Sequence, residues 1–298
     1  MSTGRAIGAV REIHRHPVKS MGGESIRETL IEKRFGVVGD RAWAIRDLSA
    51  GEIRGAKKIP ALMMLGARYL EDPKDGASAP IEIDLGDGRR VRSGDPSVSE
   101  RISEQLGRPV QLCSRPPAHD KAHYRRARPI TDPDAEMREA YELLPDEPTP
   151  KLMEGPVDLS LVTEYVSPPG TYFDFFHLHL LTLQSLARLQ SLLPDSQVDP
   201  RRFRPNLVID WAGSEQPFPE FAWPGRCLAI GELRLQVIMP AMRCGMITHA
   251  QADLRKDPSI MRAVVRECDM NFGVGAQVLT PGCVRVGDRV RLLEPGSD

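Results

Sequence analysis

The sequence predicts a mostly β protein with some helix, arranged as two β-barrel-like units. Short β-type runs separated by turn residues occur in both halves of the chain, and a proline- and charge-rich stretch divides them at residues 114–170. With 298 residues the chain is long enough for two ordinary domains. We therefore expect a β-barrel-like unit over residues 1–113, an insertion or linker over 114–170, and a β-barrel with flanking helices over 171–295.

Composition and charge exclude several classes of protein. The 40 basic and 41 acidic residues balance to a net charge of −1, and no basic stripe interleaved with aromatic residues suggests a nucleic-acid partner. No run approaches the roughly 18 apolar residues of a membrane span, and the N-terminus has no apolar secretory core. Five cysteines without a C-x-x-C pair indicate neither a disulfide framework nor a four-thiolate metal site. We expect a cytoplasmic protein without membrane association.

Short strands and one helix are expected in the first unit. The runs "AIGAVREIHRHPV" and "VVGDRAWAIRD" are β-rich, and "IEIDLGDGRRVRS" alternates on both sides of Asp87-Gly88, which predicts a hairpin. The stretch "SVSERISEQLG" predicts a helix, because Ile102 and Leu106 share one face and Gly107 is a typical stop. This pattern fits a small β-barrel or sandwich with one helix.

The stretch 114–170 is the best candidate for a linker or a long excursion. A helix should start there at Thr131 or Asp132, followed by Pro133. Long excursions from compact domains are often lids or binding loops. A solvated surface insertion is the alternative, and the sequence leaves both open.

Strands and two further helices are expected in the second unit. The run "TYFDFFHLHLLTLQSLARLQSLLP" reads as a strand that turns at Thr182 into a helix stopped at Pro194. The stretch "DPSIMRAVVREC" predicts a helix capped by Asp257 with Pro258 at its first position. The runs "FRPNLVIDW", "CLAIGELRLQVIMP" and "CVRVGDRVRLL" predict strands or hairpins.

Motifs of the common nucleotide-binding, zinc-protease and serine-hydrolase sites are absent from the sequence. Instead, anion-seeking side chains recur at the ends of predicted strands, in "HPVKS", "GDRAW", "RRFRPN" and "MRCG". Lysine, arginine and hydroxyl groups bind phosphate, and a cysteine thiolate beside them ligates metals or attacks electrophiles. Each fragment alone is also consistent with a turn, a local Asp40–Arg41 ion pair or a buried thiol.

Taken together and in order, these motifs resemble the MOSC protein family with an associated N-terminal β-barrel region. That family includes the mitochondrial amidoxime reducing component and bacterial relatives. The resemblance extends from "HPVKSMGGESIRETLIEKRFGVVGDRAWAIRD" through "GTYFDFFHLHLLTLQSLARL" and "DPRRFRPNLVID" to "MRCGMITHAQADLRKDPSIMRAV" and "NFGVGAQVLTPGCVRVGDRVRLL". It covers nearly the whole chain outside residues 114–165.

The resemblance implies a molybdenum cofactor, a molybdopterin that ends in a phosphate, with the metal bound by the thiolate of Cys244. By motif position, the residues that would hold the cofactor are Lys19, Ser20, Arg41, Thr182, Arg204, Asn206 and Arg243. Two departures from the family pattern stand out. Ala241 and Met242 precede the Arg-Cys pair, where relatives often carry a cysteine and a small hydroxyl residue. Leu183 and Gln184 follow Thr182, where a second hydroxyl or acidic residue is common.

The activity implied by the resemblance is the two-electron reduction of a small N-hydroxylated substrate. The electrons would come from a separate donor protein that carries a flavin, haem or iron–sulfur group. Two alternatives remain open: a carrier that binds the same cofactor without turnover, and a metal-free thiol or sulfur-transfer protein that uses Cys244. The sequence leaves undecided the physiological substrate, the donor, the oligomeric state, and whether the cofactor is a monophosphate or a dinucleotide.

Overall fold

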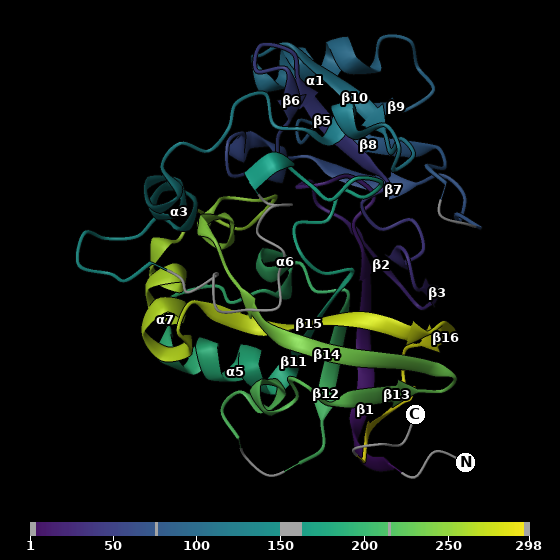
Figure 1. Cartoon of the computed structure of the whole chain (residues 1–298), viewed down its shortest axis with the longest axis vertical. Helices are drawn as coiled ribbons and strands as arrows, with labels where there is room; N and C mark the ends of the chain where they lie inside the picture. The colour runs from purple at the N-terminus through teal and green to yellow at the C-terminus, as the bar shows by residue number, and fades with distance from the viewer. Residues whose placement is uncertain (1–3, 75–76, 150–162, 214–215, 295–298) are drawn as a thin grey trace.

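The structure is a computed structural model that describes residues 4–74, 77–149, 163–213 and 216–294. Its main feature is a seven-stranded barrel in the lower half of Figure 1. The strand order is β12-β11-β15-β14-β13-β17-β1, and β1 closes the ring by pairing with β12. The strands are β1 (Gly4–Arg15), β11 (Leu178–Thr182), β12 (Leu207–Trp211), β13 (Cys227–Ile230), β14 (Leu233–Met242), β15 (Asn271–Thr280) and β17 (Arg289–Leu293).

The N-terminal strand β1 therefore belongs to the barrel, which is not built from residues 171–295 alone. It runs antiparallel to β12 and β17, with Val10 opposite Ile209 and Gly4 opposite Leu293. Its buried side chains Ile7, Val10 and Ile13 join the apolar core of the barrel. Because β1 carries three core side chains, separating it from the later strands would open both the ring and its core.

A second β unit lies above the barrel in Figure 1 and has an apolar core of its own. Its strands are β5 (Trp43–Asp47), β6 (Glu52–Ile53), β7 (Gly66–Tyr69), β8 (Ile81–Asp84), β9 (Arg90–Arg92) and β10 (Val110–Ser114). The expected hairpin is confirmed as β8 and β9. The expected helix is α1 (Val98–Leu106), which buries Ile102 and ends at Gly107 in the left-handed conformation. The 3-10 helix η1 (Pro60–Met64) buries Leu62 in the same core.

Of the two outcomes expected for "CVRVGDRVRLL", strands or a hairpin, the structure shows separate strands, and β16 (Gly282–Arg285) is not paired with β17. It pairs instead with β3 (Glu28–Glu32), which also pairs with the two-residue strand β4 (Gly36–Val37). Strand β2 (Glu24–Ile26) extends the large sheet beyond β1. The pairing of β16 with β3 links the N-terminal segment to the part of the chain that forms the last strands of the barrel.

Helices α5 (Leu183–Leu192) and α7 (Pro258–Cys268) pack beside the barrel and begin at the predicted caps. The Thr182 hydroxyl accepts the N–H of Ser185 at 3.1 Å, and Asp257 accepts the N–H of Ser259 at 3.0 Å. Such caps each stabilise a helix by about 1 kcal/mol. Two short helical turns, α6 (Pro200–Phe203) and η3 (Pro219–Ala222), complete this layer.

The middle stretch, residues 114–170, packs against the rest of the molecule where the structure describes it. Residues 150–162 lie outside the described residues. Helix α2 (Lys121–Tyr124) is followed by α3 (Pro133–Tyr141), which starts at Asp132 as predicted. Tyr141 is buried in the core that α5 and α7 share. On α7, Arg262 pairs with Glu147 and donates to the carbonyl of Glu142 at 2.6 Å. These contacts fix α3 against the barrel layer.

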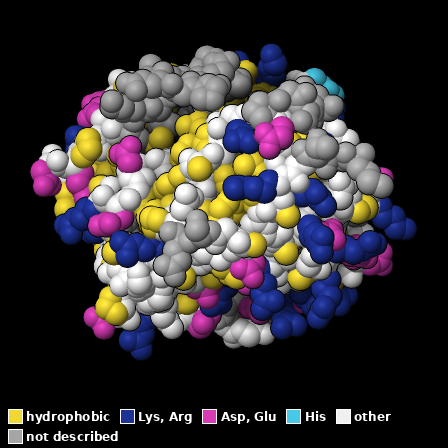
Figure 2. All heavy atoms as spheres, turned by 90° about the horizontal axis from the view of Figure 1, so that it is seen from below, with side chains coloured by type: hydrophobic (Ala, Val, Ile, Leu, Met, Phe, Trp, Pro, Cys, Tyr) yellow, Lys and Arg dark blue, Asp and Glu magenta, His cyan; other side chains and the backbone are white. Residues whose placement is uncertain are grey.

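Among the described residues, no helix combines the length and apolar character needed to cross a bilayer. The face seen from below carries apolar side chains around its centre, with basic and acidic side chains interspersed along its sides (Figure 2). Charges of both signs therefore share this face.

Candidate functional site

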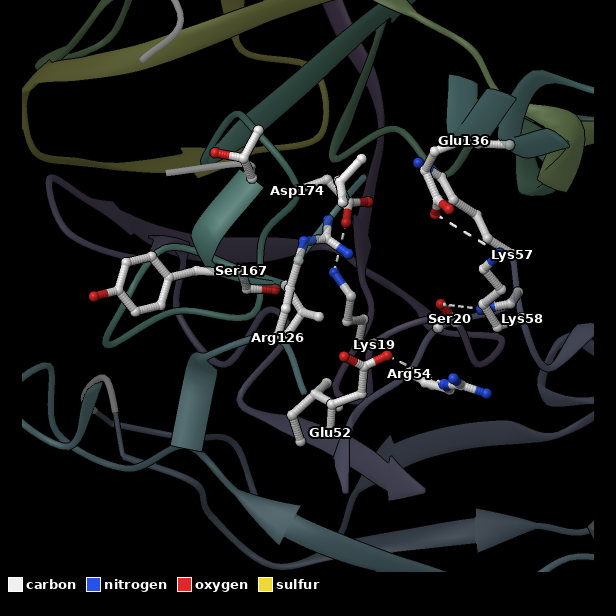
Figure 3. Close-up of a pocket in the computed structure, with 18 of the residues that line it drawn as sticks. Lys19, Ser20, Glu52, Arg54, Lys57, Lys58, Arg126, Glu136, Ser167 and Asp174 are labelled. Atoms are coloured by element: carbon white, nitrogen blue, oxygen red, sulfur yellow. Dashed lines mark hydrogen bonds and ion pairs between the residues drawn. The ribbon is translucent and has the colours of Figure 1, made fainter. Parts of the chain in front are cut away.

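A cleft of about 1460 Å³ lies where the upper β unit, α3 and the barrel meet (Figure 3). Its lining includes Lys19 and Ser20 after β1, Lys57 after β6, Tyr141 at the end of α3, and Asp174 before β11. Segments far apart in the sequence thus contribute charged groups to one space. Of the eight predicted site residues, Lys19 and Ser20 line this cleft directly.

Lys19 is fixed by an acidic partner that the sequence analysis did not select. Its ammonium donates to Asp174 Oδ1 at 2.7 Å and to the carbonyl of Tyr172 at 2.9 Å. Burial lowers the pKa of Lys19. Burial would raise the pKa of Asp174, but Lys19 and Lys57 outweigh it and hold that pKa below its ordinary value. Asp174 stands in "TYFDFFH", the motif already noted, although nothing local distinguishes it from a surface carboxylate.

Ser20 adopts the left-handed conformation, with φ at 68°. Its Oγ accepts the N–H of Ala56 at 2.9 Å, which joins the "PVKS" turn to the loop that carries Lys57. Gly55 leaves room for this contact, because a Cβ at that position would lie 2.7 Å from Ser20 Oγ. The two loops therefore hold one another in place beside the cleft.

Asp40 organises the next part of the site from a fully buried position. Its Oδ1 accepts the N–H of His16 at 2.7 Å, while its Oδ2 accepts Asn206 Nδ2 at 3.0 Å and pairs with Arg41. Burial would raise its pKa, but Arg41 and His16 lower it below the ordinary range. The "GDR" motif contained this residue, and the ion pair considered from the sequence is present. Asp40 also connects Arg41 with Asn206, which the sequence could not show.

Arg204, which is buried, and Arg243, which is half-buried, add positive charge close to Arg41. Arg204 donates to the carbonyl of Met21, and Arg243 donates to the carbonyl of Phe203 at 2.8 Å. Within the described residues, Arg204 Nη2 and Arg243 Nε are buried without a hydrogen-bond partner. Burial, assisted by Arg41, lowers the pKa of Arg204 to about 9, and burial lowers that of Arg243.

Such an arrangement is costly unless an anion accompanies it, because like charges repel and unpaired buried donors lose their solvation. Phosphate oxygens are suitable acceptors for guanidinium donors. The buried arginines therefore fit a phosphorylated group.

Cys244 lies two residues after the end of β14 and is the N-cap of the 3-10 helix η4 (Gly245–Thr248). It is partly buried, adjoins Arg243, and packs on the core that contains Tyr141. Burial would lower the pKa of Lys57, but Cys244 and Asp174 raise it above its ordinary value, so both lie near that ammonium. In the described ranges no cluster of three or more His, Cys, Asp or Glu side chains could bind a metal ion.

Thr182 is a predicted site residue that the structure does not place beside the other predicted site residues. Its side chain is fully buried, caps α5 and donates to Glu220 Oε2 at 2.7 Å. Ser185 donates to the same oxygen at 2.7 Å, and burial raises the pKa of Glu220. The hydroxyl is thus engaged inside the protein, and we leave Thr182 out of the site.

A β-barrel joined to a smaller β unit, with basic side chains and a cysteine where they meet, defines a protein suited to an anionic cofactor. The chain belongs to the MOSC family: residues 171–291 match the MOSC domain, and residues 7–87 match the MOSC N-terminal beta barrel domain. MOSC domains are associated with the binding of molybdenum cofactor. No protein of curated function is significantly similar to this chain.

Solved structures resemble the chain weakly. YiiM from Geobacillus stearothermophilus is 16% identical, with a TM-score of 0.32 over 41% of this chain and 56% of that one. YiiM from Escherichia coli is 17% identical, with a TM-score of 0.30 over 41% of this chain and 57% of that one. The YUAD protein from Bacillus subtilis is 10% identical, with a TM-score of 0.42 over 96% of this chain and 94% of that one. The chain thus spans just over half the length of either YiiM protein.

Proposed function

We propose that this protein binds a molybdenum cofactor between its two β units and reduces N-hydroxylated small molecules. The observation that carries the proposal is the pair of buried, unpartnered donors on Arg204 and Arg243 beside Arg41. They match the phosphate of a molybdopterin, and Cys244 directly follows one of them. Membership of the MOSC family supports the same cofactor.

In this proposal each residue has a distinct part. Arg41 and Arg204 bind the phosphate, Arg243 holds the cofactor next to the metal, and Cys244 donates a thiolate to molybdenum. Lys19 and Ser20 contact the cofactor from the cleft side. Asn206 and Asp40 act mainly as positioning residues, because their polar atoms are engaged with each other and with the backbone around His14, His16 and His179.

When bound, the cofactor would supply the two-electron redox chemistry that the reduction needs. The overall change cleaves one N–O bond: the N–OH group, two electrons and two protons give N–H and water. The electrons arrive one at a time from a separate protein with a flavin, haem or iron–sulfur group. The cleft admits the substrate to the side of the site formed by Lys19, Tyr141 and Asp174.

The test is to purify the protein from a host that makes the cofactor and to measure molybdenum and oxidised pterin. We expect both in the wild type, loss of metal in Cys244→Ala, and reduction of benzamidoxime with a chemical electron donor. Absence of metal and pterin from the wild type would contradict the proposal. A loaded protein that reduces no N-hydroxylated compound would instead be a cofactor carrier. Full loading and activity in Cys244→Ala would remove Cys244 from the metal.

A further inference from the structure

Lys57 presents a charge to the cleft that the proposed cofactor site does not use. It lies in the loop after β6 and lines the cleft, where protein surrounds its ammonium but its side chain stays open to the solvent in the cleft. Its ammonium lies 5.7 Å from the centre of the Tyr141 ring. Among the described residues it forms no ion pair or hydrogen bond, whereas the adjacent Lys58 pairs with Glu139 at 2.8 Å. Lys58 therefore attaches its loop to α3, and the ammonium of Lys57 remains available to bind a ligand in the cleft.

Lys57 is held in its cationic form, because Cys244 and Asp174 outweigh burial and raise its pKa above the ordinary value. Besides burial, the charge of Lys57 contributes to lowering the pKa of Lys19, and Arg126 contributes to lowering the pKa of Lys57. Asp174 is the carboxylate that raises the pKa of Lys57. Asp174 is already bonded to Lys19 at 2.7 Å. Figure 3 shows the Lys19 ammonium directed at Asp174, and Lys57 and Arg41 also act on this carboxylate. A further negative group in the cleft would be attracted to Lys57.

Apolar side chains make up much of the remaining wall. Tyr141, Phe175, Phe176, Ile238 and Met246 line the same cleft. A small-molecule site with apolar walls and a few fixed polar groups suits a ligand with an apolar body and one charged end. Cys244 packs against the buried cluster that contains Tyr141, so the wall of the cleft beside Lys57 lies close to the cysteine.

We propose that Lys57 binds a carboxylate on the substrate, so that the protein prefers small N-hydroxylated compounds that carry an apolar ring and an anionic group. This inference rests on the proposed function and adds the substrate class. Anchoring the carboxylate at Lys57 would hold the molecule against the Tyr141 ring within reach of Cys244. Lys57 is then a specificity-determining residue that touches substrate and has no part in holding the cofactor.

Two substrates with the same ring separate this role from the chemistry: benzamidoxime and 4-carboxybenzamidoxime. In the loaded wild type we expect a higher kcat/KM for the carboxylate. In Lys57→Met the kcat/KM for 4-carboxybenzamidoxime should fall about tenfold, the loss of one charge-assisted hydrogen bond, with benzamidoxime within about twofold. Lys57→Arg should retain the preference. Lys58→Met is the matched control, and it should leave the ratio of the two kcat/KM values unchanged.

A binding measurement keeps the inference testable if turnover fails. The dissociation constant of 4-carboxybenzamidoxime is measured by calorimetry on the purified wild type, Lys57→Met and Lys58→Met, with thermal melting to confirm that each is folded. Weaker binding in Lys57→Met alone supports the carboxylate site even if neither compound is reduced, an outcome that would contradict only the proposed function. Equal dissociation constants in the three proteins, or no preference for the carboxylate in the wild type, would overturn the inference.

Discussion

Asp40 and Asn206 are 166 positions apart in the sequence and are joined in the interior by a hydrogen bond of 3.0 Å from Asn206 Nδ2 to Asp40 Oδ2. The same carboxylate pairs with Arg41 and accepts the N–H of His16. One buried charge thus holds together the "GDR" turn, the end of β1 and the start of β12. The alignment of Arg41 depends on it.

Replacing Asp40 by Asn should therefore destabilise the protein and weaken cofactor binding. The substitution keeps the shape but leaves Arg41 without its buried partner, which costs about 3 kcal/mol. Chemical denaturation checks the free energy of unfolding, and pterin content checks the cofactor. Asp87→Asn, at an exposed turn where the carboxylate pairs with its neighbour Arg89, should leave both close to the wild type. Unchanged stability in Asp40→Asn would contradict the role given to Asp40.

Gly55→Ala tests the contact between the two loops beside the cleft. A Cβ would lie 2.7 Å from Ser20 Oγ and displace it from the N–H of Ala56. We expect a clear loss of cofactor, with a change in unfolding free energy of only about 1 kcal/mol. The matched control is Gly94→Ala, because Gly94 has open space around it and an ordinary φ. Equal cofactor content in the two variants would exclude Ser20 from the site.

Thr182→Val separates the helix cap from the cofactor. The variant removes the cap of α5 and one hydroxyl donor to buried Glu220, so it should destabilise the protein by about 2 kcal/mol. The molar ratio of molybdenum to folded protein should stay at the wild-type level. Loss of cofactor from a variant that remains folded would return Thr182 to the site.

The free energy of unfolding should fall as the pH is lowered from about 7.5 to about 5, because the buried His179 stays neutral in the folded protein. Burial and Arg243 lower the pKa of His179 to about 3, against about 6.5 in an unfolded chain. The unfolded state therefore binds more protons below pH 6.5, and His179 alone removes about 2 kcal/mol of stability by pH 5. His179→Gln should flatten this dependence in denaturation measurements, while His119→Gln, at an exposed position, should not. Identical pH profiles in all three proteins would contradict this assignment.

Arg262 should hold α3 in place over η4. It reaches from α7 to Glu147 and to the carbonyl of Glu142, whose side chain accepts a hydrogen bond from Thr248 at 3.1 Å. In Arg262→Ala the amides of α3 should exchange with deuterium about tenfold faster, because the helix opens more often. Arg266→Ala, one turn later on the exposed side of α7, is the control. Equal exchange would show that Arg262 does not hold α3 in place.

Local features were predictable because local sequence determines them. Asp132, Asp257 and Gly107 mark helix ends through contacts within a few residues, and the structure confirms them. Strand partners were less predictable, since pairing depends on segments that meet only in the folded chain. Hence β1 was assigned to the first unit, whereas it closes the barrel by pairing with β12. For "CVRVGDRVRLL" the sequence left strands and a hairpin both open, and β16 pairs with β3.

The candidate site also combines residues that the sequence identified with residues that only the folded chain brings together. Family motifs identified Lys19, Arg41 and Arg204, whose side chains the fold gathers between the two β units. Asp174 and Lys57 were not selected, because a single charged residue in a loop looks like any surface charge until its neighbours are known. Thr182 shows the converse, since a motif position turned out to be a helix cap with its hydroxyl already engaged.

The closure of the barrel by β1 has a consequence for biosynthesis. Val10 pairs with Ile209, and Gly4 pairs with Leu293 near the other end of the chain. During synthesis β1 therefore cannot pair with β12 or β17, and its apolar side chains stay uncovered, until those much later strands have been made. The upper β unit has its own core and contains only residues that emerge in this interval. It is thus the part of the molecule suited to fold during translation, while the barrel is completed only after synthesis of β17.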